Sequence, residues 1–241
     1  MQVIDIYTDG SSRGNPGRGG WGSIVCIKPK NKDGNTDKIV ELGGFEEATT
    51  NNRMELTAIK ESLSHIEKRK IEGEINIFTD SSYALNGLSG WMYGWEKNGW
   101  KTSTGEDVLN KDIWQELLGL FLRIKRKNGI NMNKVKGHSG VLLNERADDI
   151  ATMYADKEHV FLFTGSRSQY EALYKNELKE KKTKTPNFKA YSYVSLVGGK
   201  VFIDKSWEDC KKRVSGKSGV LYKKSRNEED EKRIIEEFRK S

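Results

Sequence analysis

Two acidic residues each follow a short segment that predicts a β-strand. Residues 4–8 are rich in isoleucine, tyrosine and threonine and precede Asp9, and residues 75–79 have a similar character and precede Asp80. If the two strands are neighbours in one sheet, the two carboxylates meet at the same edge. Such a pair can hold a cation, although a solvated aspartate beside a hairpin is the alternative for either residue alone.

Two further acids, Glu55 and Asp148, lie on predicted helices. Glu55 is in the first turn of a helix that follows a cluster of N-cap residues, 49–52, and Asp148 is in the first half of a helix over residues 143–155. Crowded carboxylates raise one another's pKa, and a hard divalent cation removes that cost. Oxygen-only ligands favour Mg²⁺ or Mn²⁺ over zinc, and two such ions about 3.5–4 Å apart commonly cut phosphodiesters.

The elements that must position these acids alternate along the chain. Residues 10–22 hold six glycines and a proline, which predicts a glycine-rich turn after the first strand. Three hairpin strands followed by alternating helices and strands predict an α/β fold, with a mixed five-stranded sheet and helices on both faces. The other predicted elements are strands over residues 21–27, 39–45 and 131–136 and a helix over residues 111–127.

The composition is that of a globular protein, with 35% hydrophobic residues among 241. No run of 18 or more apolar residues occurs, so we expect no membrane span. Cys26 and Cys210 lie far apart and imply no disulfide framework, and the N-terminus lacks the basic and apolar regions of a signal peptide. We therefore expect a cytoplasmic location.

Positive charge is concentrated in the last third of the chain. Residues 1–163 contain 22 lysines and arginines against 23 aspartates and glutamates, whereas residues 164–241 contain 20 against 12. A basic module attached to a near-neutral domain indicates a polyanionic partner. A merely solvated lysine-rich tail is the alternative.

Several short motifs follow one another in a distinctive order along residues 2–156. They are Tyr-Thr-Asp-Gly-Ser with Gly-Asn-Pro-Gly and Gly-Gly-Trp-Gly, Thr-Asn-Asn-Arg-Met-Glu-Leu, Thr-Asp-Ser-Ser-Tyr, a spaced set of tryptophans, and Lys-Gly-His-Ser-Gly with Asn-Glu-Arg-Ala-Asp. In these motifs the chain resembles type 1 ribonuclease H. The resemblance implies a ribonuclease H-like fold and an endonuclease that hydrolyses the RNA strand of RNA–DNA hybrids, leaving 5′-phosphate and 3′-hydroxyl ends.

The resemblance also implies a role for each acid. Asp9, Glu55, Asp80 and Asp148 would be the ligands of two Mg²⁺ ions, for which Mn²⁺ can substitute, in two-metal-ion catalysis. His138, in a glycine-flanked loop, would shuttle protons or assist product release. An ordinary surface histidine is the alternative for His138.

Further residues match family positions that contact nucleic acid. Asn15, Asn51 and Asn52 would line the minor groove, where a ribonuclease must sense the 2′-hydroxyl, or would hold a phosphate. Turn and N-cap duty is their structural alternative. Trp91 and Trp95 would form the surface along which the DNA strand runs, and core packing is the alternative for both.

Two stretches depart from the family pattern. Ser82 stands where the family usually has a glutamine that touches a base edge, and a serine is shorter. Residues 96–111 correspond to the basic protrusion of many bacterial members, but here acids are mixed with the lysines. We expect this segment to hold a duplex weakly.

The C-terminal segment resembles the small hybrid-binding domain found at the N-terminus of many eukaryotic ribonucleases H. By that resemblance Trp207 and Tyr222 would stack on deoxyribose while Lys223 and Lys224 meet phosphates, which recognises the backbone without reading sequence. The alternative places Trp207 and Tyr222 in a small core.

These observations predict three parts: a ribonuclease H catalytic domain over residues 1–157, a connecting segment and linker over residues 158–187, and a small basic α+β domain over residues 188–241. The expected partner is an RNA–DNA hybrid duplex, with no membrane and no obligate protein partner, so we expect a monomer. Two alternatives are a same-fold nuclease that acts on structured DNA and a non-catalytic hybrid-binding protein. The asparagines and the histidine loop argue against the first, and the presence of all four acids argues against the second.

Overall fold

The computed structural model describes residues 2–29, 37–135, 141–174, 190–215, 220–225 and 227–239. The chain divides into two compact units, Met1–Asn176 and Glu177–Ser241, and each unit is described by itself. Within the described residues, no helix has both the length and the apolar character needed to cross a membrane.

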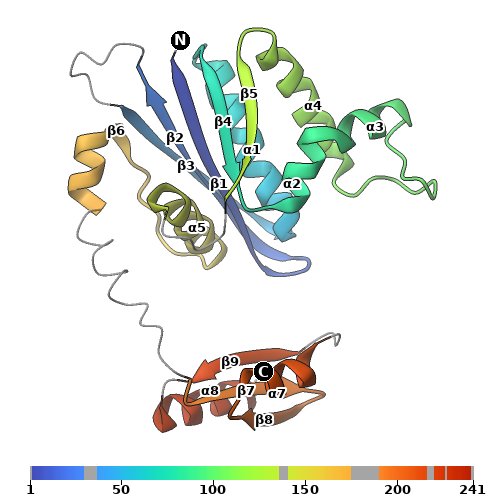
Figure 1. Cartoon of the computed structure of the whole chain (residues 1–241), viewed down its shortest axis with the longest axis vertical. Coiled ribbons are helices and arrows are strands. Elements are labelled where there is room, and N and C mark those ends of the chain that lie inside the picture. Colours follow the sequence, from blue (N-terminus) through green and yellow to red (C-terminus); the bar gives the residue numbers. More distant parts are fainter. Residues whose placement is uncertain are drawn as a thin grey trace. The chain divides into compact units, whose positions relative to one another are not determined.

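The first unit is built on a mixed sheet with the strand order β5-β4-β1-β2-β3-β6 (Figure 1). Its β1, β2 and β3 form an antiparallel meander, β4 pairs parallel with β1, and β5 pairs parallel with β4. This arrangement confirms the predicted α/β fold. The strands are β1 (Val3–Gly14), β2 (Gly17–Lys28), β3 (Lys38–Thr49), β4 (Glu74–Thr79), β5 (Gly129–Lys134) and β6 (Thr164–Ser166).

Helices cover both faces of this sheet, as predicted (Figure 1). On one face, Leu56, Ile59 and Leu63 of α1 join Ile4 and Ile6 of β1 in the main hydrophobic core. On the other face, α5 packs over β1 and β2. The helices are α1 (Asn51–Lys68), α2 (Ser82–Asn86), α3 (Met92–Lys97), α4 (Lys111–Lys125) and α5 (Leu142–Ala155), with a π-helical turn, η1 (Gly87–Trp91), between α2 and α3.

The sheet has one strand more than the five that the sequence predicts. The additional strand, β6, pairs antiparallel with residues 38–40 of β3. Its sequence, Thr-Gly-Ser, has no apolar alternation, and the chain is held there by the preceding residue Phe163, whose carbonyl oxygen accepts a hydrogen bond from the amide of Glu41 (2.8 Å). Tertiary contacts rather than local pattern therefore determine β6.

The glycine-rich turn predicted for residues 10–22 is wrong for most of its length. Strands β1 and β2 continue through these residues, and only residues 15 and 16 turn the chain. A Cβ on Gly22 would lie 2.2 Å from the carbonyl oxygen of Ala147 in α5, and a Cβ on Gly10 would lie 2.4 Å from the amide nitrogen of Glu55 in α1. Glycine occurs inside these strands because helix backbones lie directly against them.

The second unit confirms the predicted small α+β domain. Its three strands form an antiparallel sheet in the order β8-β7-β9. Helix α8 places Ile234 and Phe238 against Val194 of β7, and Cys210 of α7 lies against Ser195, the next residue of that strand. Because neighbouring residues of a strand point to opposite faces, the two helices cover opposite faces of the sheet. The elements are β7 (Ser192–Val197), β8 (Lys200–Asp204), α7 (Trp207–Val214), β9 (Leu221–Ser225) and α8 (Glu228–Arg239).

We expect Gly22→Ala to destabilise the first unit by about 1–3 kcal/mol, because the new methyl group must displace the backbone of α5. The matched control is Gly94→Ala, since a Cβ at that position of α3 meets no atom within 4 Å and alanine favours a helix over glycine by up to about 1 kcal/mol. Urea unfolding followed by circular dichroism measures both changes. Unaltered stability of the Gly22→Ala variant would contradict the close packing of α5 on β2.

Candidate active site

The pairing of β1 with β4 brings two acids to one edge of the sheet. The last paired residues are Tyr7 and Phe78, so Asp9 and Asp80 each lie two residues beyond the end of the pairing. Strand β1 continues past Asp9, whereas β4 ends just before Asp80. The expectation that these carboxylates meet at one edge is therefore confirmed.

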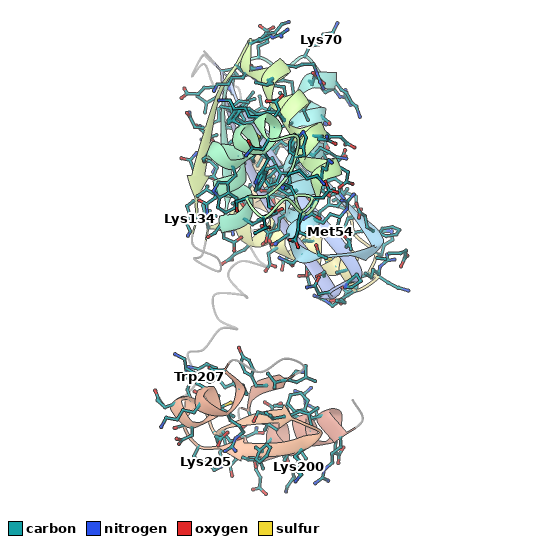
Figure 2. The ribbon with its side chains drawn as sticks, turned by 90° about the vertical axis from the view of Figure 1, so that its right-hand side faces the viewer. Met54, Lys70, Lys134, Lys200, Lys205 and Trp207 are labelled. Atoms are coloured by element: carbon teal, nitrogen blue, oxygen red, sulfur yellow. The ribbon has the colours of Figure 1, made fainter. Side chains whose placement is uncertain are left out.

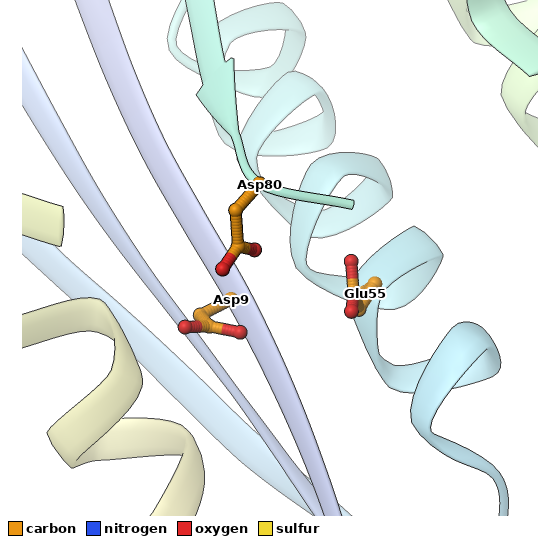
Figure 3. Close-up of side chains that lie close together, drawn as sticks. All are labelled: Asp9, Glu55 and Asp80. Carbon is orange, nitrogen blue, oxygen red and sulfur yellow. The ribbon is translucent and has the colours of Figure 1, made fainter. Parts of the chain in front are cut away.

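Glu55 joins them from the first turns of α1. The side chain of Thr50 caps this helix by accepting a hydrogen bond from the amide of Arg53 (3.3 Å), and the missing side chain at Gly10 lets the helix backbone lie against β1. One carboxylate oxygen from each of Asp9, Glu55 and Asp80 lies within 4.8 Å of the other two (Figure 3). We call these three residues the carboxylate group.

Burial and repulsion by neighbouring charges disfavour the ionised forms of Asp9 and Glu55. The pKa of Asp9 is raised to about 8. Burial is the largest cause, and the charges of Asp80, Asp148 and Glu55 add to it, while a hydrogen bond from the Gly10 amide (2.7 Å) opposes it. Burial likewise raises the pKa of Glu55 to about 7, with the charge of Asp80 adding to the effect and the Ser81 hydroxyl opposing it.

Asp148, the fourth predicted acid, lies half-buried on α5. It is not one of the three residues whose oxygens lie within 4.8 Å of one another. Its charge nevertheless acts on Asp9, where it is one of the causes of the raised pKa. The position of Asp148 relative to the carboxylate group depends on how α5 is seated on the sheet.

The carboxylate group has the chemistry of a site for a hard cation. One oxygen of Glu55, Oε1, accepts a hydrogen bond from the side-chain amide of Asn51 (2.9 Å). The other, Oε2, is buried and has no hydrogen-bond partner among the described residues. A buried carboxylate oxygen without a donor is unfavourable unless a cation compensates it. The all-oxygen donor set therefore fits a divalent ion of the Mg²⁺ type.

Comparison with known proteins points to the same chemistry. The family model described as RNase H matches residues 1–156. A ribonuclease H of Syntrophomonas wolfei is 45% identical over 153 residues, which are 63% of this chain and 94% of that protein. A ribonuclease HI of Neisseria meningitidis is 45% identical over 150 residues, 62% of this chain and 93% of that protein. The chain belongs to the ribonuclease H family.

A solved ribonuclease H also shares the fold. The crystal structure of LC9-RNase H1, described as a type 1 RNase H with the type 2 active-site motif, has a TM-score of 0.59 and 26% sequence identity to this chain, and the match covers 70% of this chain and 81% of that one. The family match ends at residue 156. What the second unit of this ribonuclease H does must therefore be inferred from its own residues.

The three asparagines predicted to contact nucleic acid lie exposed at two places in the first unit. Asn51 and Asn52 begin α1 beside Glu55, and Asn15 lies at the tip of the β1–β2 hairpin. The hydrogen bond from Asn51 to Glu55 was not predicted from the sequence. The spacing of four residues between Asn51 and Glu55, which places both on one face of the helix, could have indicated this hydrogen bond.

The two tryptophans predicted to contact DNA differ in exposure. Trp91 is 45% exposed, whereas Trp95 is half-buried and packs on the buried Trp114 with ring centroids 5.5 Å apart. The rings of Trp91 and Trp95 lie 5.8 Å apart. Trp91 thus offers a surface, and Trp95 joins that surface to the core.

Two of the three lysines of the protrusion, residues 96–111, already have an acidic partner. Lys101 and Lys111 both lie 3.0 Å from a carboxylate oxygen of Asp107. At the position of the missing glutamine, the Ser82 hydroxyl accepts a hydrogen bond from Lys134 (3.2 Å). His138, the predicted proton carrier, lies outside the described residues.

Aromatic side chains form one face of the second unit. The Trp207 ring lies between those of Tyr193 and Tyr222, at centroid distances of 5.6 and 5.4 Å. Trp207 is half-buried and Tyr222 is 53% exposed, whereas the apolar core with Val194 lies across the sheet. We call these three rings the aromatic face.

The two neighbouring lysines of β9 differ in their relation to this face. Lys224 pairs with Tyr193, and Lys223 pairs with Val194. Directly paired residues share a face of a sheet, so Lys224 projects on the side of the aromatic face and Lys223 on the side of α8. Lys200 and Lys205 add exposed positive charge to the same unit (Figure 2).

We expect Asp9→Asn to stabilise the metal-free protein. The folded-state pKa of Asp9, about 8, lies above its ordinary value of 3.8, so the unfolded chain releases the proton first and stability falls as pH rises between these values. At pH 8 the variant should be more stable than the wild type by about 1–3 kcal/mol, with a smaller difference at pH 5.

The measurement is chemical unfolding at both pH values, in chelator and then in Mg²⁺. Added Mg²⁺ should reduce the difference in stability between Asp9→Asn and the wild type, because an ion that binds the folded wild type stabilises it. Equal stability of the two proteins at pH 8 in chelator would show that the Asp9 charge is not disfavoured in the fold.

Proposed function

We propose that this chain is an endonuclease that hydrolyses the RNA strand of RNA–DNA hybrids with divalent cations held by Asp9, Glu55, Asp80 and Asp148. The chain is a ribonuclease H, and relatives of that name are 45% identical to it over nearly their whole length. The observation that carries the proposal is the carboxylate group, in which Glu55 is buried and has no cationic partner among the described residues.

The residues around the site have distinct parts in this proposal. Divalent ions, when bound, activate water and neutralise the leaving oxygen of a phosphodiester, so that 5′-phosphate and 3′-hydroxyl ends result. Asn51 holds Oε1 of Glu55 and thereby fixes the orientation of its carboxylate. Asp148 contributes further negative charge near Asp9. We assign the ions as Mg²⁺, with Mn²⁺ able to replace it, because oxygen ligands suit both.

We propose that exposed side chains of the first unit recognise the hybrid. The exposed asparagines at the start of α1 would meet the minor groove, where the 2′-hydroxyl distinguishes RNA from DNA. The exposed ring of Trp91 would lie against the DNA strand, as aromatic rings do in single-strand grooves. His138 would carry protons or assist product release.

We propose a second activity for the C-terminal unit, which is binding of the hybrid backbone through the aromatic face. Trp207 and Tyr222 present adjoining rings on which sugars can stack, and Lys224 projects on the same side. The last third of the chain also carries the whole excess of positive charge. Such a surface recognises a duplex without reading its sequence.

Cleavage of labelled substrates tests the nuclease assignment. In Mg²⁺ the wild type should cut an RNA–DNA hybrid but not double-stranded RNA, double-stranded DNA or a hybrid with 2′-deoxy sugars around the scissile position, and chelator should stop cleavage. Asp9→Asn should bind the hybrid nearly as well as the wild type and keep less than about a tenth of its activity, since lost transition-state stabilisation costs several kcal/mol. Equal cutting of all-DNA duplex would refute the hybrid reading.

Variants of the C-terminal unit test hybrid binding. Truncation after residue 186 should raise KM for long hybrids with little change in kcat, because the four acids remain. The double change Lys223→Ala with Lys224→Ala should reduce the log–log salt slope of binding by about 1–2. Of the two single changes, Lys224→Ala should have the larger effect, because only Lys224 shares the aromatic face.

A short hybrid that spans only the catalytic cleft serves as the control substrate and should respond little to either variant. If the C-terminal unit only solubilises the protein or docks a protein partner, both variants should have the same KM and salt slope on long hybrids as the wild type.

A further inference from the structure

A buried carboxylate joins three separate segments of the first unit. Glu41 of β3 has a fully buried side chain, and four donors reach its two oxygens. Arg146 of α5 donates two hydrogen bonds (2.8 and 3.0 Å), the Phe163 amide donates one (3.0 Å), and the Tyr170 hydroxyl donates one (3.1 Å). Strand, helix and C-terminal extension therefore meet at one ion pair.

The extension, residues 158–174, is bound to Arg146 by further contacts. The guanidinium also donates to the carbonyl oxygen of Phe161 (3.0 Å) and lies over the ring of Tyr174, 4.9 Å from its centroid. The Tyr170 ring packs between Phe163 (5.2 Å) and Tyr174 (4.6 Å), and Tyr170 is completely buried. We call residues 158–174, together with their contacts to Glu41 and Arg146, the clasp.

The second half of α5 is seated by packing and by an ion pair. Ile150 and Tyr154 lie directly against glycine backbone of β2 and β3. Just after the helix, Asp156 pairs with Arg13 of β1. Asp148 lies in the first half of α5, so its position also depends on the contacts that this half makes.

Arg146 is well placed to restrain the first half of α5. It lies two residues before Asp148 on the same helix, and at about 100° per residue the two side chains leave α5 on roughly opposite sides. One side is bound by the clasp, while the other carries the acid whose charge acts on Asp9. A turn of the helix that released Arg146 would move Asp148 relative to the carboxylate group.

We propose that the clasp positions Asp148 for cation binding by holding α5 through Arg146 and Glu41. This inference rests on the proposed function, since it deepens the role of the same acid. Residues 158–174 then act as part of the nuclease unit, and Tyr170 and Glu41 are positioning residues that touch neither cation nor substrate. Nothing in the local sequence of the extension would identify this role.

The test uses Tyr170→Phe in the full chain, which keeps the buried ring and removes one donor to Glu41. Mg²⁺ affinity, measured by calorimetry without substrate, should fall about 3-fold or more, and the Mg²⁺ concentration for half-maximal cleavage should rise equally, with KM for the hybrid unchanged. The control is Ile124→Val, a destabilising change at a buried residue of α4, which should leave Mg²⁺ affinity at the wild-type value.

A double variant shows whether the clasp acts through Asp148. In the Asp148→Asn background, Tyr170→Phe should add nothing to the loss of Mg²⁺ affinity, because the group that it positions is gone. The proposal is overturned if Tyr170→Phe lowers only stability, or if its effect adds in full to that of Asp148→Asn. Should the wild type itself neither bind Mg²⁺ nor cut the hybrid, it is the proposed function that fails.

Discussion

The fold brings three carboxylates together against their mutual repulsion. Asp9, Glu55 and Asp80 place oxygens within 4.8 Å of one another, and burial disfavours the charge of Asp9 and Glu55. Such an arrangement persists only if the surrounding packing is strong enough to hold it without a cation. The main core beneath α1, with Ile4 and Ile6 fully buried, supplies that packing directly under the group.

Much of this site follows from the sequence, because the strand segments before Asp9 and Asp80 are readable from local pattern, although β1 continues to Gly14 and does not end at Asp9. An apolar segment ending in an acid predicts where Asp9 and Asp80 lie, and parallel pairing of β1 with β4 then brings them together. The position of Glu55 in the first turns of α1 follows from the helix start predicted at residues 49–52. Asp148 is likewise predicted on a helix from local pattern, and the family motifs add its assignment to the site.

The features that the sequence did not predict depend on contacts between distant residues. Glycines at positions 10 and 22 read locally as a turn, yet they lie in strands because helix backbones pack against them. Strand β6 has no apolar alternation and forms where residues 38–40 offer a free edge. The four-donor environment of Glu41 joins residues 41, 146, 163 and 170, and no window of local sequence contains that set.

Electrostatics gives a reason for a separate basic unit. A nuclease site made of carboxylates repels the phosphates that it must approach. The protrusion adds little attraction, because two of its three lysines, Lys101 and Lys111, pair with Asp107. Residues 1–163 are close to neutral, with 22 basic against 23 acidic side chains, so long-range attraction for a polyanion must come from the C-terminal third. In that third, α8 and the apolar core with Val194 occupy one face of a small sheet, while α7 lies on the opposite face and carries Trp207 beside Tyr222. Because Cys210 of α7 is fully buried, the rings proposed to bind the hybrid are held by a helix that also packs on the sheet.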